Sequence, residues 1–89
     1  MPRVLADLVD AGLETGFALV QLAETQSRGN ARRMLREARA ACRESERRAV
    51  RLGESDRRRL RARFANLRQA IARAEGRPVP AMVLRMPAR

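Results

Sequence analysis

The chain has 89 residues, 20 of them basic and 10 acidic, for a formal net charge of +10. This length has room for one compact domain, which excludes a catalytic domain beside a regulatory one. Because there is no His, Trp or Tyr and a single cysteine, Cys42, the usual proton shuttle and the Cys/His zinc sites are missing. We therefore expect a protein that is not an enzyme and that uses no metal or cofactor.

The sequence has no segment typical of a membrane span or a secretory signal. Near the N-terminus the longest uncharged run, residues 15–23, is far shorter than the roughly 20 apolar residues that cross a bilayer. Asp7 and Asp10 interrupt the apolar stretch that a signal peptide would need. A lone cysteine fits a reducing compartment, so we expect a cytoplasmic protein without membrane contact.

Hydrophobic periodicity and the positions of glycine and proline predict three helices, over residues 3–27, 31–52 and 56–75. Pro2 suits the first turn of a helix, where its missing N–H has no partner to lose. Gly76 and the prolines that follow it are expected to end the third helix.

Two glycine-containing turns separate these helices. Gly29 is expected to close the first helix, with Asn30 as the N-cap of the second. Gly53 repeats this arrangement and is expected to close the second helix before Ser55 or Asp56 starts the third. Such short connections make consecutive helices antiparallel neighbours.

The second and third predicted helices each carry one apolar stripe, so that they can cover a common core. The stripe of the second helix consists of Ala31, Met34, Leu35, Ala38, Ala41, Cys42, Ser45, Ala49 and Leu52. The stripe of the third consists of Leu60, Phe64, Leu67, Ala70, Ile71 and Ala74.

The first predicted helix has a much wider apolar arc, of about 220° on a helical wheel. The arc consists of Val4, Leu5, Leu8, Val9, Leu13, Phe17, Leu19, Val20 and Leu22, and Asp7, Asp10 and Glu14 lie on the remainder. Two neighbouring helices do not easily cover so wide an arc, and a lone bundle of this size is marginally stable. A homodimer is the expected way to cover the surplus.

The fold class expected is all-α, an antiparallel three-helix up-down-up bundle over residues 1–76. A short apolar tail bounded by prolines follows over residues 77–89 and carries Val79, Met82, Val83, Leu84 and Met86. The tail could dock on its own bundle, dock on a partner or second protomer, or stay disordered, and the sequence leaves these three alternatives open.

Two glycines at the centre of the apolar arc, Gly12 and Gly16, point to close approach of another backbone, since each costs a helix up to about 1 kcal/mol. The approaching helix is either the alanine-rich second helix of the same chain or a helix across a dimer interface. The residues expected at an oligomer or partner interface are Gly12, Gly16, Phe17, Val20, Met82, Val83 and Leu84.

A row of arginines lies opposite the core on the second predicted helix: Arg32, Arg36, Arg39, Arg43 and Arg47. It spans roughly 22 Å at the rise of an α-helix and could contact nucleic-acid phosphates. The charge is also lopsided, because residues 1–27 carry one arginine and four acids whereas residues 28–89 carry 19 arginines and six acids. An ordinary solvated face of an arginine-rich protein is the alternative explanation.

Residues 11–75 carry a pattern of turns and small residues known from two kinds of helical module. It comprises the turn Arg28-Gly29-Asn30, then Ala38, Ala41 and Ala49, and then a third helix running from Leu60 through Phe64 and Leu67 to Ile71 and Glu75. In this the chain resembles the three-helix modules of the MIT type and the helical hairpins of tetratricopeptide proteins. The resemblance implies a docking scaffold in which a partner segment lies in a groove between helices.

Two functions remain open from the sequence. The first is a non-enzymatic helical interaction or self-association module whose partner is a second copy or another protein. The second is a small basic nucleic-acid-associated protein that binds phosphates non-specifically through the arginine row.

Overall fold

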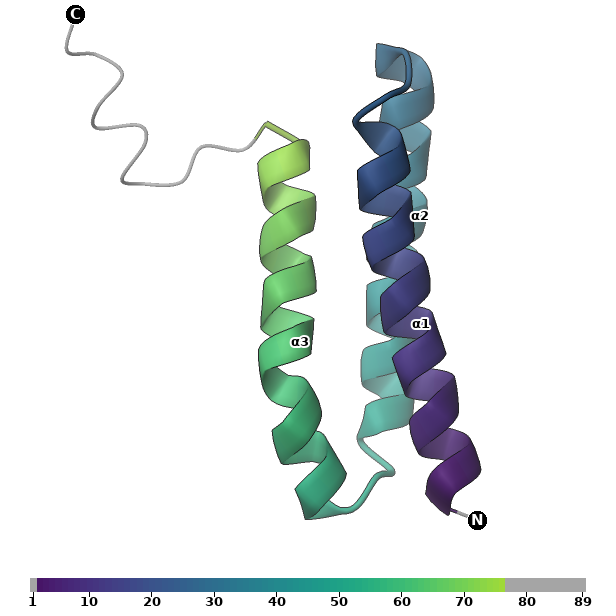
Figure 1. Cartoon of the computed structure of the whole chain (residues 1–89), viewed down its shortest axis with the longest axis vertical. Helices are drawn as coiled ribbons and strands as arrows, with labels where there is room; N and C mark the ends of the chain where they lie inside the picture. Colours follow the sequence, from purple (N-terminus) through teal and green to yellow (C-terminus); the bar gives the residue numbers. More distant parts are fainter. Residues whose placement is uncertain (1, 77–89) are drawn as a thin grey trace, which may run out of the picture.

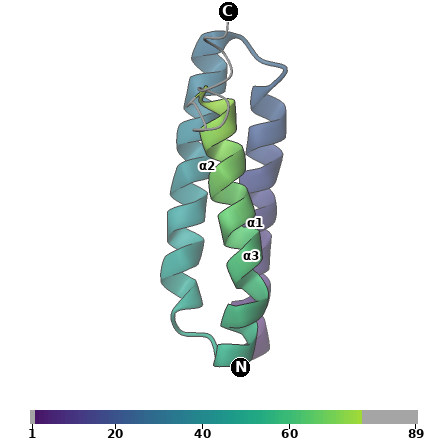
Figure 2. The ribbon, with the colours of Figure 1, turned by 90° about the vertical axis from the view of Figure 1, so that its left-hand side faces the viewer.

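The computed structural model describes residues 2–76, which form three helices and no strand. Helix α1 spans Pro2–Ala23, α2 spans Arg28–Ala49 and α3 spans Glu54–Ala74. The chain runs up α1, down α2 and up α3, and α3 lies along the groove between the other two helices (Figures 1 and 2). The predicted fold class, an all-α antiparallel three-helix bundle, is therefore confirmed. The tail, with Met82, Val83 and Leu84, lies outside the described residues.

The first helix ends four residues earlier than predicted. After Ala23 the backbone enters a turn, and the N–H of Thr25 donates to the carbonyl of Leu22 at 3.0 Å. The hydroxyl of Thr25 donates to the same carbonyl, also at 3.0 Å, which satisfies an acceptor that the helix end leaves open.

The second helix starts earlier than predicted, because Ser27 and not Asn30 is its N-cap. Ser27 is extended, with φ −61° and ψ 162°, and its carbonyl accepts the N–H of Ala31 at 2.8 Å. The expectation that Gly29 closes the first helix is wrong, since Gly29 and Asn30 both lie in the first turn of α2.

The second turn differs from the prediction in the same way. Gly53 does not close α2 but is the extended N-cap of α3, with φ −67° and ψ 166°, and its carbonyl accepts the N–H of Arg57 at 3.0 Å. Ser55 and Asp56 therefore lie inside the first turn of α3 and do not start it. The acidic side chain of Asp56 suits that turn, where the helix dipole favours negative charge.

The predicted end of the third helix is confirmed. Gly76 follows the last turn with φ 78°, the left-handed conformation that a side chain disfavours. The N–H of Gly76 donates to the carbonyl of Arg73 at 3.0 Å.

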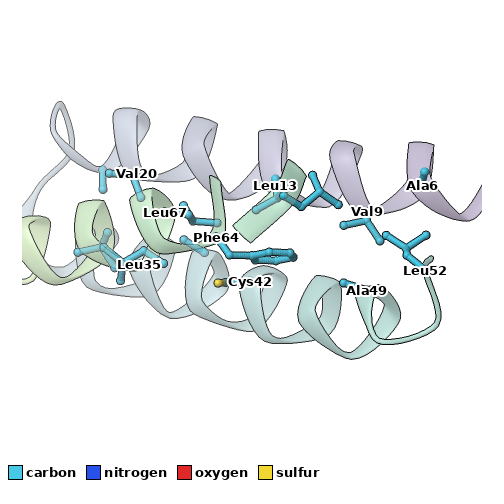
Figure 3. Close-up of a cluster of buried hydrophobic side chains, with 14 residues drawn as sticks. Ala6, Val9, Leu13, Val20, Leu35, Cys42, Ala49, Leu52, Phe64 and Leu67 are labelled. Atoms are coloured by element: carbon cyan, nitrogen blue, oxygen red, sulfur yellow. The ribbon is translucent and has the colours of Figure 1, made fainter. Parts of the chain in front are cut away.

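All three helices contribute to one apolar core. Its buried members are Ala6, Val9, Leu13, Val20, Ala23, Leu35, Ala38, Cys42, Ala49, Leu52, Leu60, Phe64, Leu67 and Ile71. In Figure 3, Leu13 of α1, Cys42 of α2 and Phe64 of α3 converge on the same stretch of this core. One polar side chain, Ser45, is buried with them.

Ion pairs connect α3 to both other helices. On the α1 side, Asp10 accepts from Arg63 at 2.9 Å and from Arg59 at 3.3 Å. On the α2 side, Arg39 donates to Glu75 at 2.6 Å. These pairs are partly exposed, so each contributes little to the free energy of folding.

No helix in the part of the chain that the structure describes is long and apolar enough to span a membrane.

Candidate interaction surfaces

One face of α1 leaves large apolar side chains exposed. The exposed fractions are 67% for Val4, 45% for Leu8 and 49% for Leu22. Three smaller residues of the same face are also exposed, and the complete set, called the outward stripe below, is Val4, Leu8, Ala11, Thr15, Ala18 and Leu22. Its members follow one another at steps of four and three residues, which is the spacing of a coiled-coil seam.

The outward stripe is exposed because α2 and α3 cover other sectors of α1. Val9, Leu13 and Val20 point into the bundle and are buried. Beyond them, Asp10 pairs with arginines of α3. The two neighbours therefore fill only part of the wide apolar arc, and the remaining sector faces solvent.

The two edges of the outward stripe differ in chemistry. Along one edge, Leu5 and Leu19 are half-buried and pack against the core, which extends the apolar surface toward α2. Along the other edge, Asp7 and Glu14 are exposed and form no ion pair with any residue that the structure describes. An apolar centre with one charged border is a common composition for a helix that docks on another helix.

The glycines expected at an interface lie at contacts inside the chain's own bundle. A Cβ added at Gly12 would overlap the Ser45 hydroxyl of α2. A Cβ added at Gly16 would lie 2.7 Å from Cδ2 of Leu67 in α3. Intramolecular packing, which was one of the two alternatives, thus accounts for both glycines.

The other residues expected at an interface are placed as follows. Val20 is buried, and Phe17 is half-buried and packs against the core. Met82, Val83 and Leu84 lie outside the described residues. The sequence reasoning missed the outward stripe as a unit, although the alternating steps of four and three residues were the signal that could have identified it.

The predicted arginine row is only partly neutralised by neighbouring acids. Arg39 is paired with Glu75, and Arg47 is paired with Glu44. The remaining members of the row, Arg32, Arg36 and Arg43, are exposed and form no ion pair within residues 3–76.

The ion pair between Arg47 and Glu44, on the outer side of α2, lowers the pKa of Glu44. The hydrogen bond from Arg47, together with the positive charges of Arg47 and Arg48, holds the pKa of Glu44 below its usual value. Arg48 approaches the second carboxylate oxygen at 3.2 Å. At this end of the arginine row, two arginines therefore share one carboxylate, and their charge is only partly neutralised.

Two hollows lie between α2 and α3 and are rimmed by arginines. The larger, of about 560 Å³, lies where the start of α2 meets the end of α3 and is lined by Arg28, Arg32 and Arg36. The smaller, of about 270 Å³, lies at the opposite end of the bundle. It has an apolar floor and an arginine rim, and its lining is Glu46, Ala49, Val50, Arg57, Leu60, Arg61, Phe64 and Arg68.

The single cysteine is part of the core. Cys42 is 2% exposed, and burial together with the negative charge of Glu46 raises the pKa of its thiol. A protonated, covered thiol is a poor nucleophile. In the described part of the chain, no three acidic or thiol side chains gather into a group that could hold a metal ion.

No family model, curated protein or solved structure matches the chain. The resemblance to MIT-type and tetratricopeptide-like helical modules therefore stays a prediction.

Proposed function

We propose that this chain is a helical self-association module in which two copies pair through the outward stripe of α1. The observation that carries the proposal is the exposure of Val4, Leu8 and Leu22 on one face of a helix whose opposite face is buried. Complete burial of a Val or Leu side chain contributes roughly 1.5–3 kcal/mol. A small bundle gains stability from covering such a stripe.

The spacing of the stripe supports an antiparallel arrangement of the two α1 helices. The steps of four, three, four, three and four read the same from either end, so a two-fold axis between Ala11 and Thr15 superposes the stripe on itself. Val4 then lies opposite Leu22 of the second copy, and Leu8 lies opposite Ala18 of the second copy. Two large apolar residues thus meet near each end of the helix, and nearer the middle a large residue meets a small one, which allows side chains to interdigitate there.

The small residues at the middle of the stripe allow the helix axes to approach closely. Ala11, Thr15 and Ala18 are all exposed and none carries a long side chain. The larger Val4 and Leu22 lie near the two ends of the helix. Such an interface closes after two copies, because the same patch is used by both.

Charge at the interface gives the pairing a characteristic salt dependence. The two-fold axis brings Glu14 of the two copies to the same edge, so salt that screens like charges does not weaken the dimer. Head-to-tail pairing of the acidic α1 with an arginine-rich surface would instead weaken as salt rises. The proposal therefore expects a dimer that persists at about 500 mM salt.

Sedimentation equilibrium over a range of protein concentrations tests the proposal. Val4→Gln should weaken self-association at least tenfold, because it places an amide in the apolar interface. Val50→Gln is the matched control, since Val50 is also a valine, is also 67% exposed and lies outside α1. The proposal is rejected if the unaltered chain sediments as a monomer throughout, or if both variants weaken association equally.

A further inference from the structure

The fold brings the arginines of two helices onto one surface. On α2 they lie on the edge that faces α3, and on α3 they lie on the edge that faces α2. This surface is called the arginine face below. Arg28, Arg32 and Arg36 of α2 line the larger hollow, and Arg57, Arg61 and Arg68 of α3 line the smaller one. Arg39 and Arg43 of α2 complete it, since their charges act together with that of Arg68 on the Cys42 thiol. The sequence placed these side chains on separate helices, and only the packing of α2 beside α3 joins them.

Few carboxylates compensate the arginine face. Glu46 and Glu75 are the acids that line its two hollows. Each is already engaged, Glu46 with Arg68 and Glu75 with Arg39. The exposed arginines between and around them keep their charge uncompensated by any acid in the described part of the chain, and they produce a strong positive potential there.

The acids of α1 do not reach this surface. Asp10 is held by Arg59 and Arg63 on the α1 side of α3. Asp7 and Glu14 border the outward stripe. The molecule is therefore polarised, with its uncompensated positive charge on α2 and α3.

The arginines of α2 are spaced as a linear array. Arg28, Arg32 and Arg36 repeat every four residues, which is about 6 Å along the helix axis. Each guanidinium presents a planar fork of donors that matches two oxygens of one phosphate. An extended chain of phosphates can therefore contact several of these side chains at once.

From this arrangement we propose that the arginine face binds the phosphodiester backbone of a nucleic acid. The contacts are to phosphates and carry no sequence information. Base stacking is not available, because the chain has no Trp or Tyr, Phe64 is buried and Phe17 is half-buried against the core.

An acidic protein helix fits this surface less well than a nucleic acid does. Such a helix also needs apolar contacts with its binding surface. Along the α2 arginines these are scarce, because Leu35 is buried and Ala31 is half-buried. A regular row of arginines without an exposed apolar stripe therefore favours a nucleic-acid backbone over an acidic helix as the partner.

Fluorescence anisotropy with the complete chain tests this proposal, with labelled duplex DNA and labelled single-stranded RNA as separate probes and polyglutamate as a third. The test variant is Arg32→Gln/Arg36→Gln/Arg43→Gln, which breaks no ion pair among the described residues. The matched control is Arg33→Gln/Arg51→Gln/Arg73→Gln, which removes three exposed arginines that line neither hollow. Circular dichroism verifies that both variants fold.

The expected result is binding to one or both nucleic acids that weakens on the order of 10³-fold between about 50 and 200 mM salt. The slope of log affinity against log salt is negative, and the test variant should make it less steep by about 2.7 for a duplex, whereas the control should change it little. Binding to DNA, to RNA or to both supports the proposal and identifies the source of the phosphates. No binding at about 50 mM salt, equal losses in both variants, or polyglutamate binding as tight as nucleic acid would overturn it.

Discussion

Gly12 of α1 lies directly against the hydroxyl of Ser45 of α2. A Cβ at position 12 would overlap that hydroxyl and lie 3.4 Å from Cβ of Ser45. Ser45 is 1% exposed, and its Oγ has no hydrogen-bond partner among the residues that the structure describes. The two helices thus approach so closely that the smallest residue faces a small polar one, and this contact fixes their register.

This contact predicts that the effect of Gly12→Ala on the free energy of unfolding changes sign when Ser45 is replaced by alanine. Gly12→Ala should lower the free energy of unfolding by about 1 kcal/mol, because overpacking outweighs the gain in helix propensity. In a Ser45→Ala background the hydroxyl is gone, so the same substitution should raise the free energy of unfolding by up to about 1 kcal/mol.

Urea unfolding at one fixed protein concentration measures the four corners of this double-mutant cycle. Gly29→Ala is the control for helix propensity, since a Cβ at Gly29 would meet nothing within 4 Å. That control should be stabilising in both backgrounds. If Gly12→Ala has the same effect with serine and with alanine at position 45, the close contact does not determine the packing.

Gly16 predicts a second cycle, this time between α1 and α3. Because Leu67 is fully buried, a Cβ at Gly16 forces it to shift, and Gly16→Ala should cost about 1–3 kcal/mol. Leu67→Ala alone should cost about 2–5 kcal/mol by leaving a cavity. With both substitutions the new methyl group partly fills that cavity, so the double variant should be more stable than Leu67→Ala alone. Thermal unfolding of the three variants would contradict this if the two losses simply add.

The Glu44 cluster predicts a pH effect of defined sign. Because its pKa is lowered in the folded state, mainly by Arg47, the interaction stabilises the fold above the ordinary carboxylate pKa and is lost as pH falls through the lowered value. In an NMR titration of the carboxyl carbons, Arg47→Gln should move the pKa of Glu44 upward. An unchanged pKa in that variant would mean that the pair does not persist in solution.

Cys42 predicts that thiol labelling reports opening of the bundle. Since the thiol is buried and its pKa is raised, a neutral reagent should modify the folded chain far more slowly than the unfolded chain. Ala40→Cys in a Cys42→Ala background gives the control, because Ala40 is exposed on the same helix. Equal labelling rates for the two thiols under native conditions would contradict the placement of Cys42.

The helices could be predicted from periodicity, whereas their ends could not. A glycine fits the C-cap of one helix and the N-cap or first turn of the next, and only the backbone angles separate these roles. Gly76 has the positive φ of a C-cap. Gly53 is an extended N-cap and Gly29 is helical, so the glycine signal was assigned to the wrong side of both turns.

The interaction surfaces were predictable in kind but not in detail. The width of the apolar arc of α1 indicated that some of it would stay uncovered. Which sector stays uncovered depends on where α3 docks. The contacts of Asp10 with Arg63 and of Gly16 with Leu67 identify the side of α1 that α3 covers, and these contacts form only in the folded bundle. The arginine face likewise requires the lateral packing of two helices, which no single helical wheel contains.

Disulfide cross-linking of a mixture tests the central claim, antiparallel pairing of α1, most directly. Chains carrying Val4→Cys are mixed with chains carrying Leu22→Cys and oxidised, with the unaltered chain as the control for buried Cys42. The account predicts a cross-linked dimer containing one chain of each kind, and little cross-linking when either variant is alone. No covalent dimer in the mixture, or efficient cross-linking of Val4→Cys with itself, would contradict it.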